Sequence, residues 1–241
     1  MLLSLLSSGN LQQFFITLLL TFPVVVFALS LHETAHGYVA YKCGDPTAYH
    51  LGRLTLNPFK HLDPIGTLCM LVFGFGWAKP VPINTRNFRD PKRGMAISAA
   101  AGPMANLTLG VISAVLLGFF SAYYLYLHYT TEGFPLSFVY WVIQFCYISA
   151  SCNFVFMVFN LIPVPPFDGS RIAFVFLKPQ QYFSIMRYER QIMAGILIAL
   201  FALNWMFDFS PFSWVASQLT WRIELPVSDF FWEKVFLPML L

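Results

Sequence analysis

Two histidines and a glutamate in the first fifth of the chain have the residue types and the spacing of a metal hydrolase. Residues 31–37 read L-H-E-T-A-H-G, so His32 and His36 are four positions apart and Glu33 directly follows the first histidine. On a helix, residues four apart are rotated by about 40° and rise about 6 Å, so both imidazoles project from one face and can bind one ion. This H-E-x-x-H pattern predicts a zinc-ligand pair.

Glu33 is awkwardly placed for a third ligand but well placed to contact a water beside the metal. Zinc lowers the pKa of a water to about 7, and the glutamate can then take its proton, so the predicted chemistry is hydrolysis with Glu33 as the catalytic base. A lone histidine on an apolar helix is more often a hydrogen-bonded core residue. Ionisable residues in a lipid-facing stretch are costly, however, and this cost favours the functional interpretation.

A catalytic zinc site normally takes three protein ligands and leaves one position for water. The candidates for the third ligand are Asp168, Asp63, Asp45, His50 and His61. Asp168 is favoured because it follows a proline-broken helix end, where unwound backbone could direct its carboxylate into a helix bundle. The alternative is that Asp168 only caps the helix after it. His50 and His61 are expected to be surface or hydrogen-bonding residues.

The elements that must position these residues lie in an unusually apolar chain. Charged residues make up only 10% of the 241 positions, against about 25% in soluble domains, while apolar residues reach 58%. The fold class expected from this composition is an all-α multi-pass membrane protein with four to six transmembrane helices. The net charge of +3 argues against a nucleic-acid partner.

One membrane-embedded domain, residues 1–241, is expected. Its predicted parts are a helix over 10–41, a loop over 42–93, helices over 95–128 and 136–161, an Asp-Gly loop and polar segment over 162–190, a shorter helix over 191–207, and an aromatic tail over 208–241. The tail mixes tryptophans with charges, which favours a segment lying at the membrane interface, with a fifth span as the alternative.

The loop over 42–93 is rich in prolines and basic residues and cannot be a plain span. Within it, residues 49–56 alternate as a strand does, residues 65–75 form an apolar piece too short to cross, and residues 76–84 are expected to be extended. Irregular backbone at membrane depth is tolerated only against protein or a wet cavity. We therefore expect a small β-structured, membrane-associated insertion that covers the metal site.

The basic residues also indicate an orientation. Twelve of the fourteen Lys and Arg residues fall in the segments 42–93 and 171–190, which an even number of crossings places on the same side. By the positive-inside rule both segments are cytoplasmic and the N-terminus is external. The metal site then lies towards the cytoplasmic side.

Three motifs resemble those of the site-2 protease family of intramembrane zinc metalloproteases. They are H-E-T-A-H at residues 32–36, A-G-P-M-A-N at residues 101–106 and N-L-I-P-V-P-P-F-D-G at residues 160–169. The sequences L-T-L-N-P at 54–58, H-L-D-P-I-G-T at 61–67 and G-W-A-K-P-V-P at 76–82 are similar to the compact prokaryotic branch of this family. The resemblance implies a protein of a prokaryotic cell membrane.

The resemblance also implies an activity, which is hydrolysis of a peptide bond within or next to a transmembrane segment of a membrane-protein substrate. His32, His36 and Asp168 would hold one Zn²⁺ per chain, with Glu33 as the general base. Asn106 would lie near the substrate or the developing oxyanion. Gly102, Asn160 and Gly169 would be structural residues of the site. Phe167 stands where the family usually has leucine, a mild apolar change.

No room is expected for an inserted PDZ module or a CBS domain of the kind that some members of the family carry. Substrate selection would then rest on the membrane core or on a separate regulatory or adaptor protein. Two other classes of function remain open. One is a membrane-embedded zinc peptidase that acts on soluble or loop peptides, and the other is a proteolytically inactive membrane regulatory protein, against which the intact Glu33 argues.

Overall fold

Three long apolar helices dominate the computed structural model, which describes residues 10–73, 78–130, 136–177, 179–207 and 211–240. They are α2 (Leu11–Lys42), α5 (Pro91–Thr130) and α6 (Leu136–Asn160), and each is long and apolar enough to cross a membrane. The chain is therefore an integral membrane protein. The other described elements are α3 (Thr47–His50), η1 (Pro58–Lys60), α4 (Pro64–Phe73), η2 (Thr85–Asn87), α7 (Asp168–Ala173), η3 (Phe174–Phe176), α8 (Pro179–Met186), α9 (Glu189–Phe207), α10 (Pro211–Phe231), η4 (Trp232–Phe236) and η5 (Leu237–Met239).

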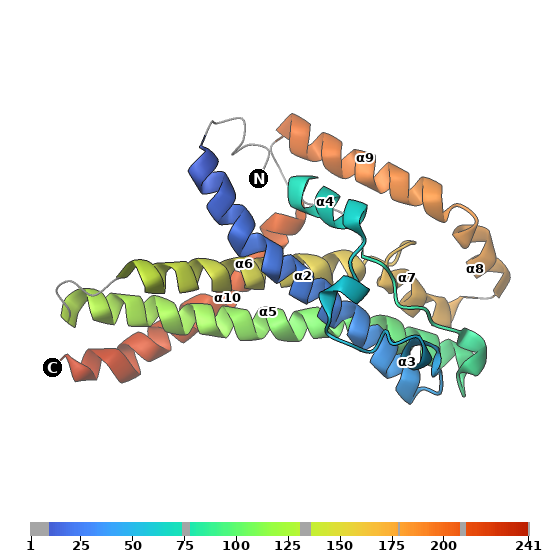
Figure 1. The fold of residues 1–241 in the computed structure, drawn as a ribbon, viewed down its shortest axis with the longest axis horizontal. Coiled ribbons are helices and arrows are strands. Elements are labelled where there is room, and N and C mark those ends of the chain that lie inside the picture. Colours follow the sequence, from blue (N-terminus) through green and yellow to red (C-terminus); the bar gives the residue numbers. More distant parts are fainter. Residues whose placement is uncertain (1–9, 74–77, 131–135, 178, 208–210, 241) are drawn as a thin grey trace.

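Helices α5 and α6 lie side by side and form the centre of the bundle, with α2 crossing them obliquely and α10 packed against both (Figure 1). At the centre, Ala114, Ala150 and Ala216 surround Phe154, and all four side chains are buried. A Cβ at Gly110 would lie 2.7 Å from the ring of Phe154. Small residues at these positions let the helices approach closely, so that apolar side chains of neighbouring helices pack against one another.

Capping residues determine where α2 and α5, two of the helices that build the site, begin. The side-chain oxygen of Asn10 accepts a hydrogen bond from the backbone N–H of Gln13, which caps the start of α2. Asp90 does the same for Lys92 and Arg93 at the start of α5, where Pro91 occupies the first helical turn. Helix α2 continues through Pro23 for 32 residues, or about 48 Å at 1.5 Å per residue.

The β-structured insertion expected between the first two long helices is wrong, because the described residues of the loop contain no strand. Residues 49–56, whose alternation suggested a strand, instead contain the end of α3 and a turn with Gly52 at φ +61°. Their backbone bonds are local, from Leu51 to Thr47 and from Arg53 to Ala48. Tyr49 and Leu51 are exposed, so the alternation marks apolar side chains on an outer surface, and no sheet face is formed.

Residues 78–84, which we call the covering segment, are irregular even though they run along α2; residues 76 and 77 of the expected extended piece lie outside the described residues. Pro80 and Pro82 remove two of the N–H donors that a β-ladder would need. Side chains satisfy other backbone groups of this segment: Arg53 donates to the carbonyls of Lys79 and Pro80, and Asp45 accepts from the N–H of Asn84.

Asp45 is fully buried and ties the covering segment to the end of α2. Its carboxylate accepts hydrogen bonds from the backbone of Thr47 and Asn84 and from the side chain of Asn87. Burial alone would raise the pKa of this carboxyl, but the hydrogen bonds, those from Thr47 and Asn87 foremost, outweigh burial and hold the pKa below its usual value. The carboxylate is therefore ionised at neutral pH and holds the segment in place.

The number of spans also differs from the expected four to six, since three helices among the described residues qualify as candidate membrane spans. The shorter helix expected over 191–207 lies in α9, whose 19 residues are near the lower limit for crossing. The tail forms α10, which carries Arg222, Glu224 and Asp229 in its second half and packs on α5 and α6.

Candidate metal centre

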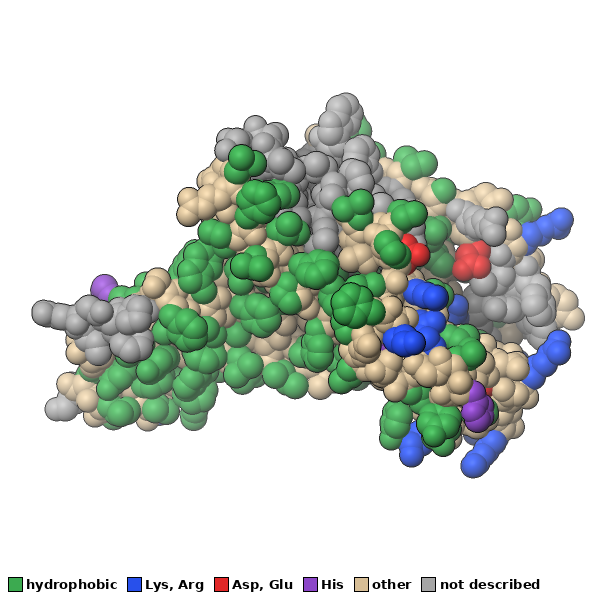
Figure 2. Space-filling view, viewed as in Figure 1, with side chains coloured by type: hydrophobic (Ala, Val, Ile, Leu, Met, Phe, Trp, Pro, Cys, Tyr) green, Lys and Arg blue, Asp and Glu red, His purple; other side chains and the backbone are tan. Residues whose placement is uncertain are grey.

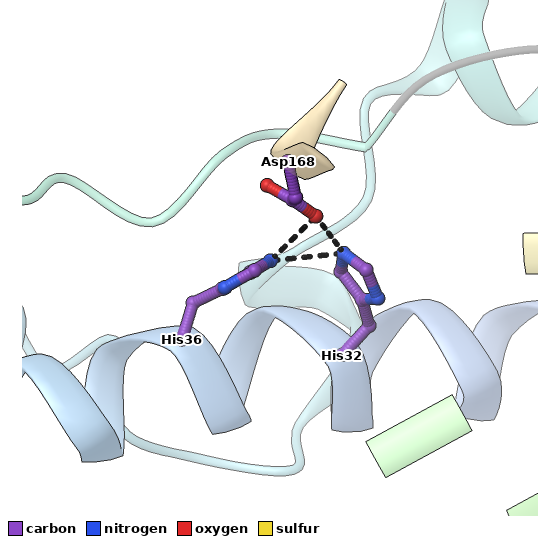
Figure 3. A group of neighbouring side chains, drawn as sticks. All are labelled: His32, His36 and Asp168. Atoms are coloured by element: carbon purple, nitrogen blue, oxygen red, sulfur yellow. Dashed lines mark hydrogen bonds and ion pairs between the residues drawn. The ribbon is translucent and has the colours of Figure 1, made fainter. Parts of the chain in front are cut away.

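His32 and His36 lie one turn apart on α2, and both side chains are buried, with 6% of each residue exposed. The third member of the cluster, Asp168, comes from the first turn of α7, 132 residues beyond His36, and is 8% exposed. The Nε2 atoms of the histidines lie 2.9 Å apart, and the Oδ2 atom of Asp168 lies 3.2 Å from His32 and 3.1 Å from His36 (Figure 3). The three donor atoms therefore form a nearly equilateral triangle.

The hydrogen bond made by Nδ1 of each imidazole determines whether Nε2, the atom in the triangle, carries a proton or a lone pair. His36 Nδ1 lies 2.7 Å from the carbonyl oxygen of Ser98, which can only accept, so this nitrogen carries the proton. His32 Nδ1 donates to the amide oxygen of Asn106 in the same way. A neutral imidazole has one N–H, so when both rings bind a metal in their neutral form, both Nε2 atoms present lone pairs on the side of the Asp168 carboxylate.

Three electron-pair donors about 3 Å apart in a buried site repel one another unless a proton or a metal ion lies between them. Two imidazole nitrogens and a carboxylate oxygen are among the ligands that zinc takes in catalytic sites. With zinc–ligand bonds of about 2.0–2.1 Å, tetrahedral geometry separates ligand atoms by about 3.3–3.4 Å, close to the observed 2.9–3.2 Å. Among the described residues this is the one group of three His, Cys, Asp or Glu side chains that could hold a metal ion.

Gly102 on α5 allows the bundle to close against the histidines. A Cβ added at this position would meet His36 Nε2 and would lie 2.6 Å from a ring carbon of each histidine. The helix backbone and the imidazole rings leave no space for a side chain here. Gly102, for which the resemblance implies a structural role at the site, packs directly against both imidazole rings.

The turn before α7 fixes the direction of the Asp168 carboxylate. Phe167 is buried and packs edge-on against Phe159 of α6, with ring centroids 4.2 Å apart. Ser170 donates from both its backbone and its hydroxyl to the carbonyl of Phe167, and a Cβ at Gly169 would lie 2.5 Å from the carbonyl oxygen of Ile162. Asp168 is therefore held between two residues that pack on the end of α6.

Glu33 is half-buried and contacts the covering segment. Its Oε2 atom accepts a hydrogen bond of 2.8 Å from the backbone N–H of Val81. Val81 is itself buried, and a Cβ at Gly37, one turn beyond Glu33, would lie 3.0 Å from its side chain. The covering segment thus lies directly on the helix that carries the histidines and orients the Glu33 carboxylate.

The other candidates for the third ligand lie apart from the cluster. Asp45 holds the covering segment, His50 is exposed, and Asp63 accepts from the N–H of Gly66 in the first turn of α4. His61 is fully buried, and its Nε2 atom donates to the carbonyl of Thr55 at 2.7 Å. Burial lowers the pKa of His61, against the opposing effect of the bond to Thr55, so its ring is neutral at neutral pH.

The two predicted asparagines have different surroundings. Asn106 is fully buried, and its amide is engaged at both ends, by His32 and by the side chain of Asn153. The role near an oxyanion that the resemblance implied for Asn106 stays a prediction. Asn160 donates to the carbonyl of Phe156 within its own helix and is half-buried.

The groups that orient the site residues were not predicted from the sequence. Two of them, the carbonyl of Ser98 and the N–H of Val81, are backbone groups, which every residue type offers alike. No residue pattern could therefore have identified them. Asn153 did carry a signal, as an amide in an apolar span, but nothing in the sequence linked it to His32.

Comparison with known proteins gives a family assignment for most of the chain. The model of peptidase family M50 matches residues 20–203. The chain is 45% identical over 149 residues to the "Putative zinc metalloprotease YwhC" of Bacillus subtilis, an alignment covering 61% of this chain and 64% of the relative. It is 28% identical over 204 residues to the "Putative zinc metalloprotease Rip2" of Mycolicibacterium smegmatis, covering 77% of this chain and 71% of the relative.

A third relative is the "Putative zinc metalloprotease MJ0611" of Methanocaldococcus jannaschii, which is 27% identical over 164 residues, with 63% of this chain and 72% of the relative covered. The chain thus spans about two thirds of the length of the curated relatives it matches. No solved structure matches it significantly.

The contacts of Gly102 generate a direct test. Replacing Gly102 by alanine should displace at least one imidazole, because the new Cβ would collide with both rings. We expect the affinity for zinc to fall about tenfold or more, as measured by competition with a chelator on the purified protein. The matched control is Gly195→Ala, since Gly195 also lies within a helix and has no atom within 4 Å of an added Cβ. Equal zinc affinity in the two variants would contradict the close approach of α5.

Proposed function

The chain belongs to peptidase family M50, and from this premise we propose that it is a membrane-embedded zinc endopeptidase. Its substrate would be a membrane protein, cleaved within or next to a transmembrane segment. The observation that carries this proposal is the cluster of His32, His36 and Asp168, in which both histidines lie on a helix long and apolar enough to span the membrane.

His32, His36 and Asp168 would hold the ion as two neutral nitrogen ligands and one anionic oxygen ligand. When bound, zinc acts as a Lewis acid, which acidifies a water and polarises the carbonyl of the scissile peptide bond. The anionic charge of a single carboxylate leaves the ion a net positive charge for this task. The N–H groups on the far side of both rings are anchored, so the imidazoles cannot rotate away.

Glu33 would act as the general base. It follows His32 on α2, and the N–H of Val81 fixes one of its carboxylate oxygens. The carboxylate takes a proton from the attacking water and then delivers it to the nitrogen of the departing amine, so that the bond between the carbonyl carbon and the amide nitrogen breaks as the new acid forms. A single group can perform both transfers because it ends the cycle ionised, as it began.

A transmembrane substrate must unwind before it can reach this site. The peptide bonds of a lipid-embedded helix are hydrogen-bonded to one another, and each bond exposed in lipid costs several kcal/mol. Polar groups close to the metal cluster, among them those of the covering segment that contacts Glu33, could accept that exposed backbone. The substrate class rests on this argument, together with the position of the cluster on an apolar helix.

We further propose that the metal cluster lies towards the cytoplasmic side. On the face drawn in Figure 2, the Lys and Arg side chains gather at the end of the molecule where α3 lies, and apolar side chains cover the length of α5. The segment from the end of α2 to the start of α5 exposes Lys42, Lys60, Arg86 and Arg89. The positive-inside rule assigns such a region to the cytoplasm.

The role of Glu33 can be separated from metal binding. Glu33→Gln should keep near-stoichiometric zinc while losing cleavage by about 10²-fold or more, because the amide has almost the same shape but cannot accept a proton. Zinc content by mass spectrometry and cleavage of a reconstituted transmembrane substrate are the two measurements. Cleavage at a near wild-type rate would remove Glu33 from the mechanism.

The third ligand is tested by metal content. Asp168→Ala should lower both zinc content and cleavage, since only two ligands would remain. Asp63→Ala is the matched control, because Asp63 is likewise a carboxylate at the start of a short helix, where it accepts from the N–H of Gly66 and lies outside the metal cluster. If Asp168→Ala kept its full zinc complement, or Asp63→Ala lost it, the assignment of Asp168 would be wrong.

The proposed orientation is tested with reporter fusions. A reporter fused after Arg89 or after Arg187 should read cytoplasmic, and one fused near Tyr129, in the last turn of α5, should read external. Opposite readings for Arg89 and Arg187 would overturn the proposal that these segments share one side of the membrane.

A further inference from the structure

A line of buried amide groups leads away from the metal cluster into the apolar core. It begins at Nδ1 of His32, continues through the side chains of Asn106 on α5 and Asn153 on α6, and ends at the backbone carbonyl of Ser149. The bonds from Asn106 to Asn153 and from Asn153 to Ser149 are each 2.8 Å long, and both asparagines are 0% exposed. No water-accessible group interrupts the line.

The last member of the line determines the direction of every bond in it. The carbonyl of Ser149 can only accept, so Asn153 must turn its NH₂ group towards it. The oxygen of Asn153 therefore faces Asn106 and must accept from the NH₂ group of Asn106. The oxygen of Asn106 then faces His32 and can only accept, so the proton of His32 is held on Nδ1.

We propose that Asn153 is a positioning residue of the metal centre, which acts through Asn106 to hold His32 with the lone pair of Nε2 directed at the metal. The inference rests on the proposed zinc site. The oxygen and the NH₂ group of an amide have almost the same shape, and rotation by 180° exchanges them. Shape alone therefore does not determine which end of Asn106 faces His32. A reversed Asn106 would present NH₂ to His32 and would favour the tautomer that carries its proton on Nε2, which cannot bind metal.

Burial makes this arrangement specific. An amide in an apolar bundle that lacks a partner costs free energy, so two asparagines on neighbouring spans are held only when both ends of each are satisfied. Ser113 on α5 and Ser149 on α6 form a second buried contact between the same helices, with their hydroxyl oxygens 2.8 Å apart. That pair does not contact His32, and it supplies a matched control.

The test is a double-mutant cycle read as the dissociation constant for zinc, measured by competition with a chelator on the purified full chain. Asn106→Leu should weaken zinc binding about 10–100-fold, because the hydrogen bond that orients His32 is lost. Asn153→Leu should weaken it about tenfold, because the amide of Asn106 could then rotate and present its NH₂ group to His32. The variant with both changes should bind zinc within about threefold of Asn106→Leu alone, because Asn153 acts only through Asn106. Ser113→Ala should bind zinc as the unmodified protein does.

A conservative replacement distinguishes positioning from a general effect on packing. The carboxyl group introduced by Asn153→Asp, in its neutral form, offers a donor and an acceptor as the amide does, so zinc affinity should stay within about threefold of the unmodified protein. If Asn153→Leu fails to fold, Asn153→Ser replaces it. A serine can donate to the carbonyl four residues earlier, as Ser30 does on α2, but is too short to reach Asn106. Asn153→Ser should then show the tenfold loss.

Three results would overturn the inference while leaving the zinc site intact: unchanged affinity in both Asn153→Leu and Asn153→Ser, losses that multiply in the double variant, or an equal loss in Ser113→Ala. Failure of the zinc site itself looks different, because the unmodified protein would then bind no zinc and His36→Ala would change nothing.

Discussion

Two imidazole nitrogens and a carboxylate oxygen lie within 3.2 Å of one another inside an apolar helix bundle, and their mutual repulsion must be offset by a proton or a metal ion. This convergence brings together α2 and α7, which are separated by more than 120 residues of chain. It requires Gly102 on α5, since any side chain there would occupy the space of the imidazoles. The packing of the bundle and the geometry of the metal centre are therefore set by the same contacts.

The polar groups around the metal centre have hydrogen-bond partners, and the hydrogen bonds of the two histidines point the same way. His32 and His36 both donate away from the cluster, to a side-chain amide and to a backbone carbonyl, and so both keep a lone pair for the metal. Glu33 is oriented separately, by the N–H of Val81 in a segment that Asp45 and Arg53 hold against α2. In a low-dielectric interior each of these bonds is costly to leave unmade, which makes the arrangement rigid before any substrate arrives.

The sequence alone was enough to predict His32, Glu33 and His36 as candidate site residues, because their spacing on a helix has a direct geometric meaning. Asp168 could be favoured over Asp63 and His61 from its place after a proline-broken helix end, and the structure brings it to the histidines. The prediction of a β-structured insertion was wrong because residues 49–56 alternate apolar and polar side chains as a strand does, but form the end of a short helix and an exposed turn. The orienting partners could not be foreseen, since a backbone carbonyl or N–H at Ser98 or Val81 has no signature in residue type.

X-ray absorption at the zinc edge of the purified, zinc-loaded protein tests the central claim most directly. A first shell of nitrogen and oxygen only, at about 2.0–2.1 Å, with the outer-shell scattering of two imidazoles, is the expected result for a centre made by His32, His36 and Asp168. Loss of one imidazole signal in His32→Ala should accompany weakened binding. Sulfur scattering at about 2.3 Å, or a signal that the His32 and His36 variants leave unchanged, would contradict the assignment and place the metal elsewhere in the chain.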